Sequence, residues 1–256
     1  MAEFLRINRR LFLARLGKGT MALAVLGACG DDPASPTTPT TATTTAGSPA
    51  TTTTAAAADL GSYHRVDLGF VSAYIVVRGP EAAVVDTGVA GSEGAVQSAL
   101  GTVDLNWAAV RHLILTHRHP DHVGSLPAVM NAATEATGYI GKADLDRVTA
   151  PRDLVAVEDG DEIFGLQVVE TPGHTAGHIS LLDPQAGVLV AGDALNGAEG
   201  GVVGPNPDFS EDHNQALATV DKIAGYDFET IYFGHGEPLM EHGSRLVKQL
   251  LTRPEY

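Results

Sequence analysis

The chain has 256 residues, of which 44% are hydrophobic, so it can build one sizeable core without being forced into several domains. Its 16 Lys and Arg stand against 31 Asp and Glu, a net charge of −15, which is the wrong sign for a surface that binds nucleic acid. A single Cys excludes an internal disulfide, and no apolar run reaches the roughly 18 residues that a membrane-spanning helix needs.

Residues 1–28 carry the order of features typical of an export signal. Five Lys or Arg come before a short, weakly apolar stretch at residues 21–28. The pair Arg9 and Arg10, followed by Leu-Phe-Leu, resembles a twin-arginine signal, and the Leu-Gly-Ala-Cys that ends at Cys29 resembles a bacterial lipobox. We therefore expect cleavage before Cys29, acylation of its thiol and a lipid-anchored protein on the extracytoplasmic face of a bacterial membrane. The alternative is an amphipathic N-terminal helix with an ordinary buried Cys.

The segment that follows cannot build a core. Of residues 31–58, 23 of 28 are Thr, Ala or Pro, and none is aromatic or an aliphatic larger than Ala. Such a segment buries too little apolar surface to offset the entropy of ordering it. We expect residues 29–58 to be a disordered tether and residues 59–256 to be the folded domain.

Short β-branched runs alternate with helical stretches in the domain. In chain order we expect strands at residues 68–77 and 82–85, a helix at 92–100, a strand at 112–115, a helix at 121–132, strands at 139–140, 155–157, 166–170, 179–182 and 188–191, a helix at 211–224, a strand at 230–233 and a helix at 242–252. Strands dominate the middle and helices flank both ends. This pattern predicts sheets packed face to face with helices outside, and loops at the strand ends that can hold a site.

Three His and one Asp fall together directly after a predicted buried strand, in the segment Thr-His-Arg-His-Pro-Asp-His. Alternate residues of an extended loop point the same way, so His117 and His119 can bind one ion. Asp121 and His122, which enter the next helix, turn toward a neighbouring position. The segment therefore predicts parts of two adjacent metal sites.

Three further candidates follow later strands. His174 lies after the strand at 166–170, Asp193 after the strand at 188–191, and His235 after the strand at 230–233. A Gly stands beside each of them, which lets the backbone approach a crowded centre. Imidazole and carboxylate ligands without thiolate favour zinc, with iron and manganese as competitors.

These motifs, H-x-H-x-D-H, P-G-H-T-x-G-H, G-D and G-H-G in this order, resemble those of the metallo-β-lactamase-fold hydrolase superfamily, and Asp86 in Val-Asp-Thr-Gly matches its first motif. The resemblance covers nearly all of residues 59–256. It implies an α/β fold, the four-layer αββα sandwich, with a dinuclear site at one edge. It also implies that Asp86 orients ligands without binding metal. The implied ligands are His117, His119 and His174 for the first metal, Asp121, His122 and His235 for the second, and Asp193 bridging both.

The other five His receive ordinary roles. We expect His178 to hydrogen-bond the backbone near the site and His112 to lie on the strand before the first motif. His64, His213 and His242 are expected at the surface.

The ligand set predicts a metal-dependent hydrolase. No G-x-S-x-G motif is present and Cys29 lies outside the domain, so the expected nucleophile is a hydroxide that bridges two zinc ions, with Asp121 to orient it or to accept its proton. Asp193 resembles the bridging Asp of glyoxalase II and the lactonases. The expected substrate is a small ester, thioester, lactone or amide, and nucleic acid is excluded by charge. Residues 196–209, rich in Gly and Pro, are either a lid that sets specificity or a surface connection.

Two alternatives remain open. The same ligands around a single iron would resemble the persulfide dioxygenases of this superfamily, which are oxidoreductases. A surface lipoprotein that kept the site as a structural element would be non-catalytic.

Overall fold

The computed structural model describes residues 61–253. The expected signal at residues 1–28, the lipid-modified Cys29 and the tether at residues 29–58 lie outside the described residues and stay predictions. None of the described helices is long and apolar enough to cross a membrane.

A six-stranded sheet occupies the first half of the described chain. Its strands follow one another in chain order from β1 to β6. The pairs β1–β2 and β2–β3 are antiparallel, whereas β3, β4, β5 and β6 run parallel. The strands are β1 (Ser62–Asp67), β2 (Ser72–Arg78), β3 (Glu81–Val85), β4 (Val110–Leu115), β5 (Thr137–Gly141) and β6 (Leu154–Val157).

A five-stranded sheet follows, in the order β13-β10-β9-β8-β7. The pair β10–β13 is parallel, and the other pairs of this sheet are antiparallel. Its strands are β7 (Glu162–Ile163), β8 (Leu166–Glu170), β9 (Ile179–Asp183), β10 (Val188–Gly192) and β13 (Thr230–Phe233), and a separate hairpin joins β11 (Asn196–Ala198) to β12 (Gly201–Val203).

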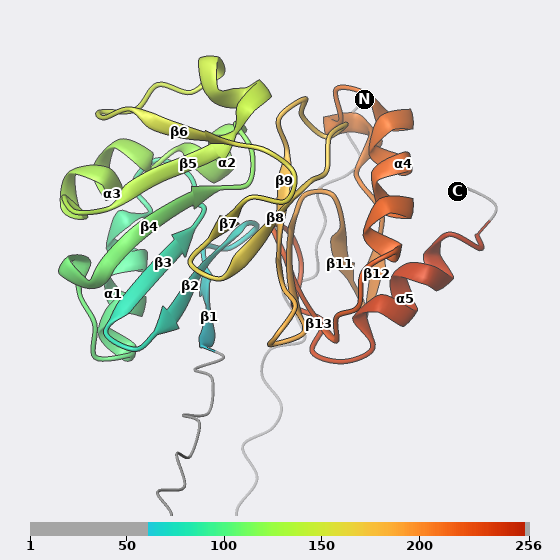
Figure 1. The fold of residues 1–256 in the computed structure, drawn as a ribbon, viewed down its shortest axis with the longest axis horizontal. Coiled ribbons are helices and arrows are strands. Elements are labelled where there is room, and N and C mark those ends of the chain that lie inside the picture. Colours follow the sequence, from blue (N-terminus) through green and yellow to red (C-terminus); the bar gives the residue numbers. More distant parts are fainter. Residues whose placement is uncertain (1–60, 254–256) are drawn as a thin grey trace, which may run out of the picture. The chain divides into compact units, whose positions relative to one another are not determined.

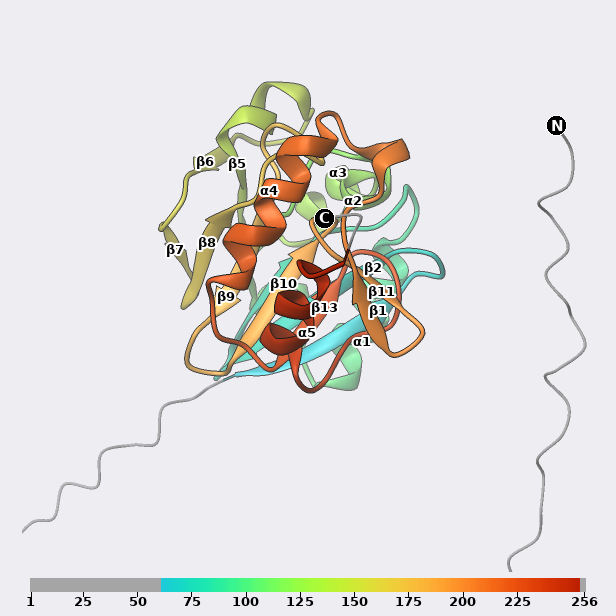
Figure 2. The same ribbon diagram turned by 90° about the vertical axis from the view of Figure 1, so that its right-hand side faces the viewer.

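Helices cover the outer face of each sheet, as Figures 1 and 2 show. On the first sheet lie α1 (Glu93–Thr102) and α3 (Leu126–Ala132), with the single turn α2 (Pro120–Val123) at the strand ends, and on the second lie α4 (His213–Ala224) and α5 (Gly243–Leu250). Among residues 61–253, 3-10 helices span Trp107–Ala109, Lys142–Arg147 and Pro207–Phe209. This arrangement confirms the predicted α/β class and the αββα sandwich.

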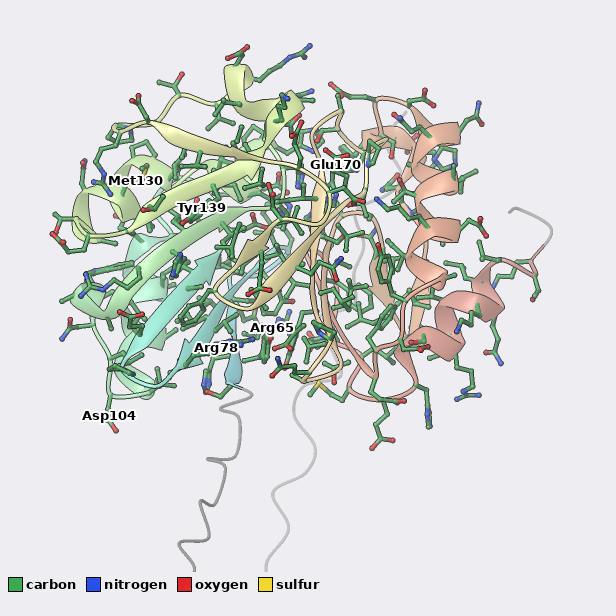
Figure 3. The ribbon with its side chains drawn as sticks, viewed as in Figure 1. Arg65, Arg78, Asp104, Met130, Tyr139 and Glu170 are labelled. Carbon is green, nitrogen blue, oxygen red and sulfur yellow. The ribbon has the colours of Figure 1, made fainter. Side chains whose placement is uncertain are left out.

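The buried apolar side chains form three layers: one under the helices of each sheet and one between the two sheets. This follows because successive strand residues point to opposite faces. In β3, Val84 packs under the helices and Val85 packs between the two sheets. Met130 on α3 and Tyr139 on β5, both labelled in Figure 3, belong to the outer and the central layer in the same way. Strands buried on both faces read as continuous apolar runs, which is why β3, β4 and β10 were predictable from sequence.

Two predicted elements were wrong in extent. The strand expected at residues 68–77 begins only at Ser72, because residues 68–71 form the turn between β1 and β2, in which Leu68 N donates to Val71 O at 3.1 Å. The helix expected at residues 121–132 is split into α2 and α3, because the loop after β3 packs into the break: Ser125 Oγ donates to Val89 O at 2.6 Å. The strand β1 was also not predicted, and the short strands β7, β11 and β12 carry too few residues for a periodic signal and were missed as well.

A buried ion pair joins the two sheets away from the strand ends that carry the motifs. The Arg78 guanidinium, marked in Figure 3, lies 2.6 Å from Asp183 Oδ2 at the end of β9. Tyr63 Oη donates to the same carboxylate oxygen at 2.6 Å, and backbone N–H groups of Gln185 and Ala186 satisfy the other oxygen. Only 1% of the Asp183 side chain is exposed, so its charge depends on these partners.

Replacing Asp183 with Ala should lower the free energy of unfolding by about 3 kcal/mol, because Arg78 would be left largely buried without a counter-charge. Urea unfolding followed by circular dichroism measures the loss. Asp104→Asn is the matched control, since Asp104 is exposed at φ 56°, a conformation that Asn accepts. A loss no larger than that of the control would contradict a stabilising role for the pair.

Candidate metal centre

The predicted ligands come together because they follow strands that end at the same edge of the sandwich. Asp86 follows β3 and the segment 116–122 follows the parallel strand β4, while Asp193 and His235 follow the parallel pair β10 and β13. Backbone hydrogen bonds tie the two sheets together at this edge, from Ile179 N to Thr116 O at 2.8 Å and from Ser72 N to Gly234 O at 2.9 Å.

Seven side chains from four segments of the chain form one cluster at this edge. Within the described residues they make three overlapping groups, in each of which the potential ligand atoms lie within 4.8 Å of one another. The groups are His117, His119 and His174; His117, His122 and Asp193; and Asp121, His122 and His235. The structure thus brings together all seven residues that the sequence singled out as ligands.

Asp193 lies between the two outer groups. Its Oδ2 is 3.3 Å from His174 Nε2 and 3.2 Å from His235 Nε2, and its Oδ1 is 3.3 Å from His122 Nε2. On the far side His235 Nε2 is also 3.3 Å from Asp121 Oδ2. One carboxylate therefore faces imidazoles of both groups.

The cluster has the unpaired atoms that a metal would satisfy. His117 Nε2, His122 Nε2 and Asp193 Oδ1 are buried and make no hydrogen bond. Buried polar atoms without a partner destabilise a fold, and a metal ion bound among these three atoms would remove that cost. Nitrogen and carboxylate oxygen donors without sulfur fit a divalent transition metal such as zinc.

Asp86 orients one of these imidazoles. Its Oδ2 accepts a hydrogen bond from His122 Nδ1 at 2.8 Å, which leaves Nε2 as the atom that faces the cluster. The carboxylate is itself held by Thr116, whose N–H and hydroxyl donate to it at 2.8 and 2.7 Å. His235 is oriented similarly, because its Nδ1 donates to the carbonyl of Phe70 at 2.6 Å.

Gly234 shows why small residues stand beside the ligands. A Cβ at this position would overlap Asp193 Oδ1 and would lie 2.8 Å from His122 Cε1. Any larger residue would push the central carboxylate away from its neighbours.

His178 supports Asp193 from the backbone side. Its Nε2 accepts a hydrogen bond from Asp193 N at 2.9 Å, and its Nδ1 lies 2.7 Å from Thr171 Oγ1. The remaining His lie outside the cluster. His112 is half-buried on β4, where its ring packs against Tyr139 and Phe164, His64 and His213 are half-buried rather than fully at the surface, and His242 is exposed.

Burial and charge divide the imidazoles into two kinds. Burial lowers the pKa of His174 to about 4 and holds the pKa of His117 well below its usual value, so these rings are neutral. Hydrogen bonds to Asp121 and Asp193 raise the pKa of His235 to about 10. Burial also lowers the pKa of His122, but the charges of Asp193 and Asp86 outweigh it and hold that pKa well above the usual value.

A cavity of about 690 Å³ opens onto the cluster. Four residues of the segment 196–209 line it, so this segment forms one wall of the cavity. The lining residues are Phe70, His119, Pro120, Asp121, His174, Asp193, Asn196, Asn206, Asp208, Phe209, Ser210, Glu211 and His235.

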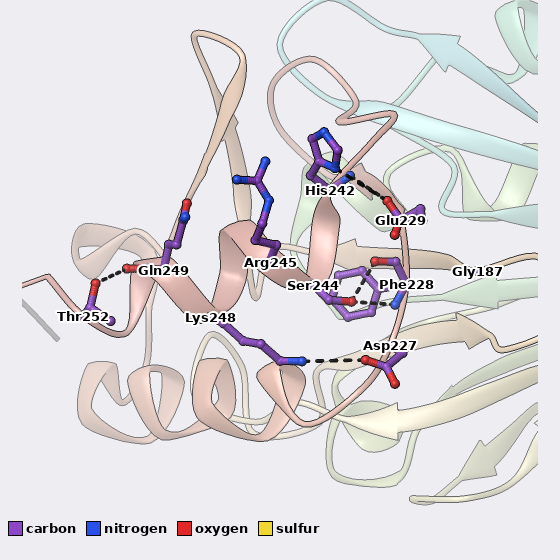
Figure 4. Close-up of a pocket in the computed structure, with 10 residues that line it drawn as sticks. All are labelled: Gly187, Asp227, Phe228, Glu229, His242, Ser244, Arg245, Lys248, Gln249 and Thr252. Carbon is purple, nitrogen blue, oxygen red and sulfur yellow. Dashed lines mark hydrogen bonds and ion pairs between the residues drawn. The ribbon is translucent and has the colours of Figure 1, made fainter.

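A second cavity, of about 700 Å³, lies at the opposite ends of β10 and β13 (Figure 4). Two of its basic side chains already face acidic side chains: Lys248 Nζ is 3.6 Å from Asp227 Oδ1, and His242 Nδ1 is 4.0 Å from Glu229 Oε2. It contains none of the cluster residues, so the cavity with convergent polar groups and perturbed pKa values is the candidate active site.

The family model described as the metallo-beta-lactamase superfamily matches residues 66–235, which include every residue of the cluster. The chain belongs to this superfamily. The match confirms the predicted family, and with it the expectation of a metal-dependent hydrolase.

Similar proteins of this superfamily include some with an assigned activity and some without. The uncharacterized protein YobT of Bacillus subtilis is 27% identical over 69% of this chain and 87% of its own length, and a metallo-beta-lactamase domain-containing protein 1 of Xenopus laevis is 33% identical over 66% and 72%. A hydroxyacylglutathione hydrolase of Parasynechococcus marenigrum is 34% identical, but the alignment covers 48% of this chain and only 50% of that enzyme.

Solved structures share the fold. A metallo-beta-lactamase family protein of Thermus thermophilus superimposes with a TM-score of 0.60 at 23% identity, over 73% of this chain and 77% of that one. TTHA1623, crystallised in a di-iron-bound form, gives a TM-score of 0.58 at 23% identity, over 73% and 95%.

One residue that supports the ligand-bearing loops was not identified from the sequence. Asp144 is 1% exposed and lies between two ligand-bearing loops. It accepts hydrogen bonds from Arg118 N at 3.0 Å in the loop of His117 and His119, and from Thr175 Oγ1 at 2.7 Å and Gly177 N at 3.0 Å in the loop of His174. Its neighbourhood, Lys-Ala-Asp-Leu-Asp, contains no motif, so only the fold reveals it.

Metal loading should release protons. Because the pKa values of His122 and His235 are raised, both rings carry a proton at pH 7 before metal binds, and each must lose it to become a ligand. About two protons per chain should therefore be released, and affinity for zinc should fall as pH falls. Calorimetric titration in two buffers of different ionisation enthalpy measures the release, with His242→Gln as control, and identical heats in both buffers would contradict it.

Replacing Asp144 with Asn should weaken zinc binding about tenfold, because one of the two acceptor oxygens that join the loops of His119 and His174 would become an NH2 donor facing another donor. Competition with a chromophoric chelator gives the affinity, and thermal unfolding checks that the variant is folded. Asp146→Asn, at an exposed position on the same 3-10 helix, is the control and should bind zinc as the parent does. An unchanged affinity in the Asp144 variant would remove this role.

Proposed function

We propose that the chain is a dinuclear zinc hydrolase that acts on a small ester, thioester, lactone or amide. The observation that carries the proposal is the arrangement of two ligand groups on either side of Asp193, beside a cavity of about 690 Å³. The relatives named as hydroxyacylglutathione hydrolases, enzymes that by name cleave an acylglutathione, support acyl transfer to water as the reaction type.

The proposed division of ligands places His117, His119 and His174 on one zinc, Asp121, His122 and His235 on the other, and Asp193 on both. A zinc pair supplies a Lewis acid for an acyl carbonyl and lowers the pKa of water toward neutrality. Asp121 lines the cavity, so its carboxylate can accept the proton of the attacking water.

The chain's own side chains favour water as the nucleophile. Ser210 is the one hydroxyl among the described lining residues, and its Oγ donates to Asn206 O at 2.7 Å. No imidazole is hydrogen-bonded to it within the described residues, so it lacks the adjacent base that activates a nucleophilic Ser.

Replacing His119 or Asp193 with Ala should remove at least one zinc per chain and lower metal-dependent hydrolysis of an ester and lactone panel by about a hundredfold or more. Metal content is measured by elemental analysis of the purified chain and hydrolysis before and after chelation. His242→Ala, an imidazole outside the cluster, is the control and should keep both.

The outcomes separate the proposal from its alternatives. About two zinc per chain with chelator-sensitive hydrolysis is the expected result. About one iron per chain with consumption of oxygen would indicate the dioxygenase-like oxidoreductase instead. A metal-loaded chain that hydrolyses no acyl substrate would contradict the proposal and leave the non-catalytic lipoprotein.

A further inference from the structure

Two aromatic side chains are exposed in the wall of the metal cavity. Phe70 is 63% exposed and Phe209 is 66% exposed, and both line this cavity. They are the two exposed Phe residues of the described chain. Apolar side chains of this size at a pocket mouth gain free energy when a ligand covers them, so they indicate an apolar group on the ligand.

The Phe70 ring and the backbone that carries Phe209 are held in place by contacts within the chain. The Phe70 carbonyl accepts the hydrogen bond from His235, and its ring stacks on that imidazole with centroids 6.0 Å apart. Phe209 ends a 3-10 helix whose first turn is closed by Asn206 Oδ1, which accepts from Asp208 N at 3.0 Å. A rigid apolar surface costs less ordering entropy on binding than a mobile one.

The charged side chains of the same wall are acidic. No Lys or Arg lines this cavity in the described part of the chain, whereas Asp208 and Glu211 do. Glu211 is neutralised by Arg118, with which it forms an ion pair, but the Asp208 carboxylate has no ion pair within residues 61–253. The cations of the C-terminal helix, Arg245 and Lys248, line the cavity at the opposite ends of the strands.

We propose that this cavity selects acyl substrates whose end remote from the scissile bond is apolar and uncharged, that Phe209 and Phe70 contact that end, and that a remote carboxylate is rejected. The inference rests on the proposed hydrolase function. The residues that would hold the metals lie together at one part of the cavity, so a substrate whose scissile carbonyl is bound there would present its other end to the wall. An anionic group there would find no counter-charge and would face Asp208.

The test compares two 4-nitrophenyl esters of equal chain length, one ending in a phenyl ring and one in a carboxylate, on the zinc-loaded full chain. The phenyl-ended ester should have a kcat/KM at least about tenfold higher. Phe209→Ala should lower its kcat/KM about tenfold, mainly through KM, with zinc content unchanged, and Phe209→Leu should restore most of the loss. Asp208→Asn should raise kcat/KM for the carboxylate-ended ester about twofold.

Met240→Ala is the control, because Met240 is 58% exposed but lies outside this cavity, and it should change neither ester. Binding of the matching non-cleavable ketones, measured by calorimetry, separates selectivity from turnover. Preferential binding of the phenyl-ended ketone without hydrolysis of either ester would support the selectivity and overturn the hydrolase function. Equal binding, or a preference that survives Phe209→Ala, would overturn the selectivity whatever the turnover.

Discussion

One constraint governs the metal centre: buried nitrogen and oxygen atoms without hydrogen-bond partners raise the free energy of the fold. His117 Nε2, His122 Nε2 and Asp193 Oδ1 converge at one edge of the sandwich without hydrogen-bond partners. Such atoms destabilise a fold unless a ligand satisfies them, and so the site and its metal belong together energetically. Much of the surrounding chain serves to keep these atoms facing one another.

The supporting contacts come from positions far apart in the sequence. Asp86 holds the imidazole of His122, His178 holds the backbone of Asp193, and Asp144 ties together the loops that carry His119 and His174. Each of these groups is buried, so its hydrogen bonds are strong and directional. The rigid sheets fix where the loops begin, and these contacts fix how the loops end.

In the function that we propose, chemistry and selectivity occupy different parts of the same cavity. The cluster would hold the metals for hydrolysis, a reaction type that many members of a superfamily can share. The wall formed by residues 196–209 contributes Phe209 and Asp208, which belong to this chain's own segment between β10 and α4. A loop can change without disturbing the sheets, so specificity is carried where sequence change costs least stability.

The amino-acid sequence by itself determined the layered α/β architecture and all seven cluster residues, because apolar runs mark buried strands and because the motifs follow those strands directly. Its strand and helix ends were less reliable: residues 68–71 turn through a local hydrogen bond, and α2 separates from α3 through a contact with a loop distant in sequence. Asp144, the exposure of Phe209 and the pairing of Arg78 with Asp183 were decided by tertiary structure alone. A single Asp or Phe carries no local pattern, and its role depends on which distant groups the fold places beside it.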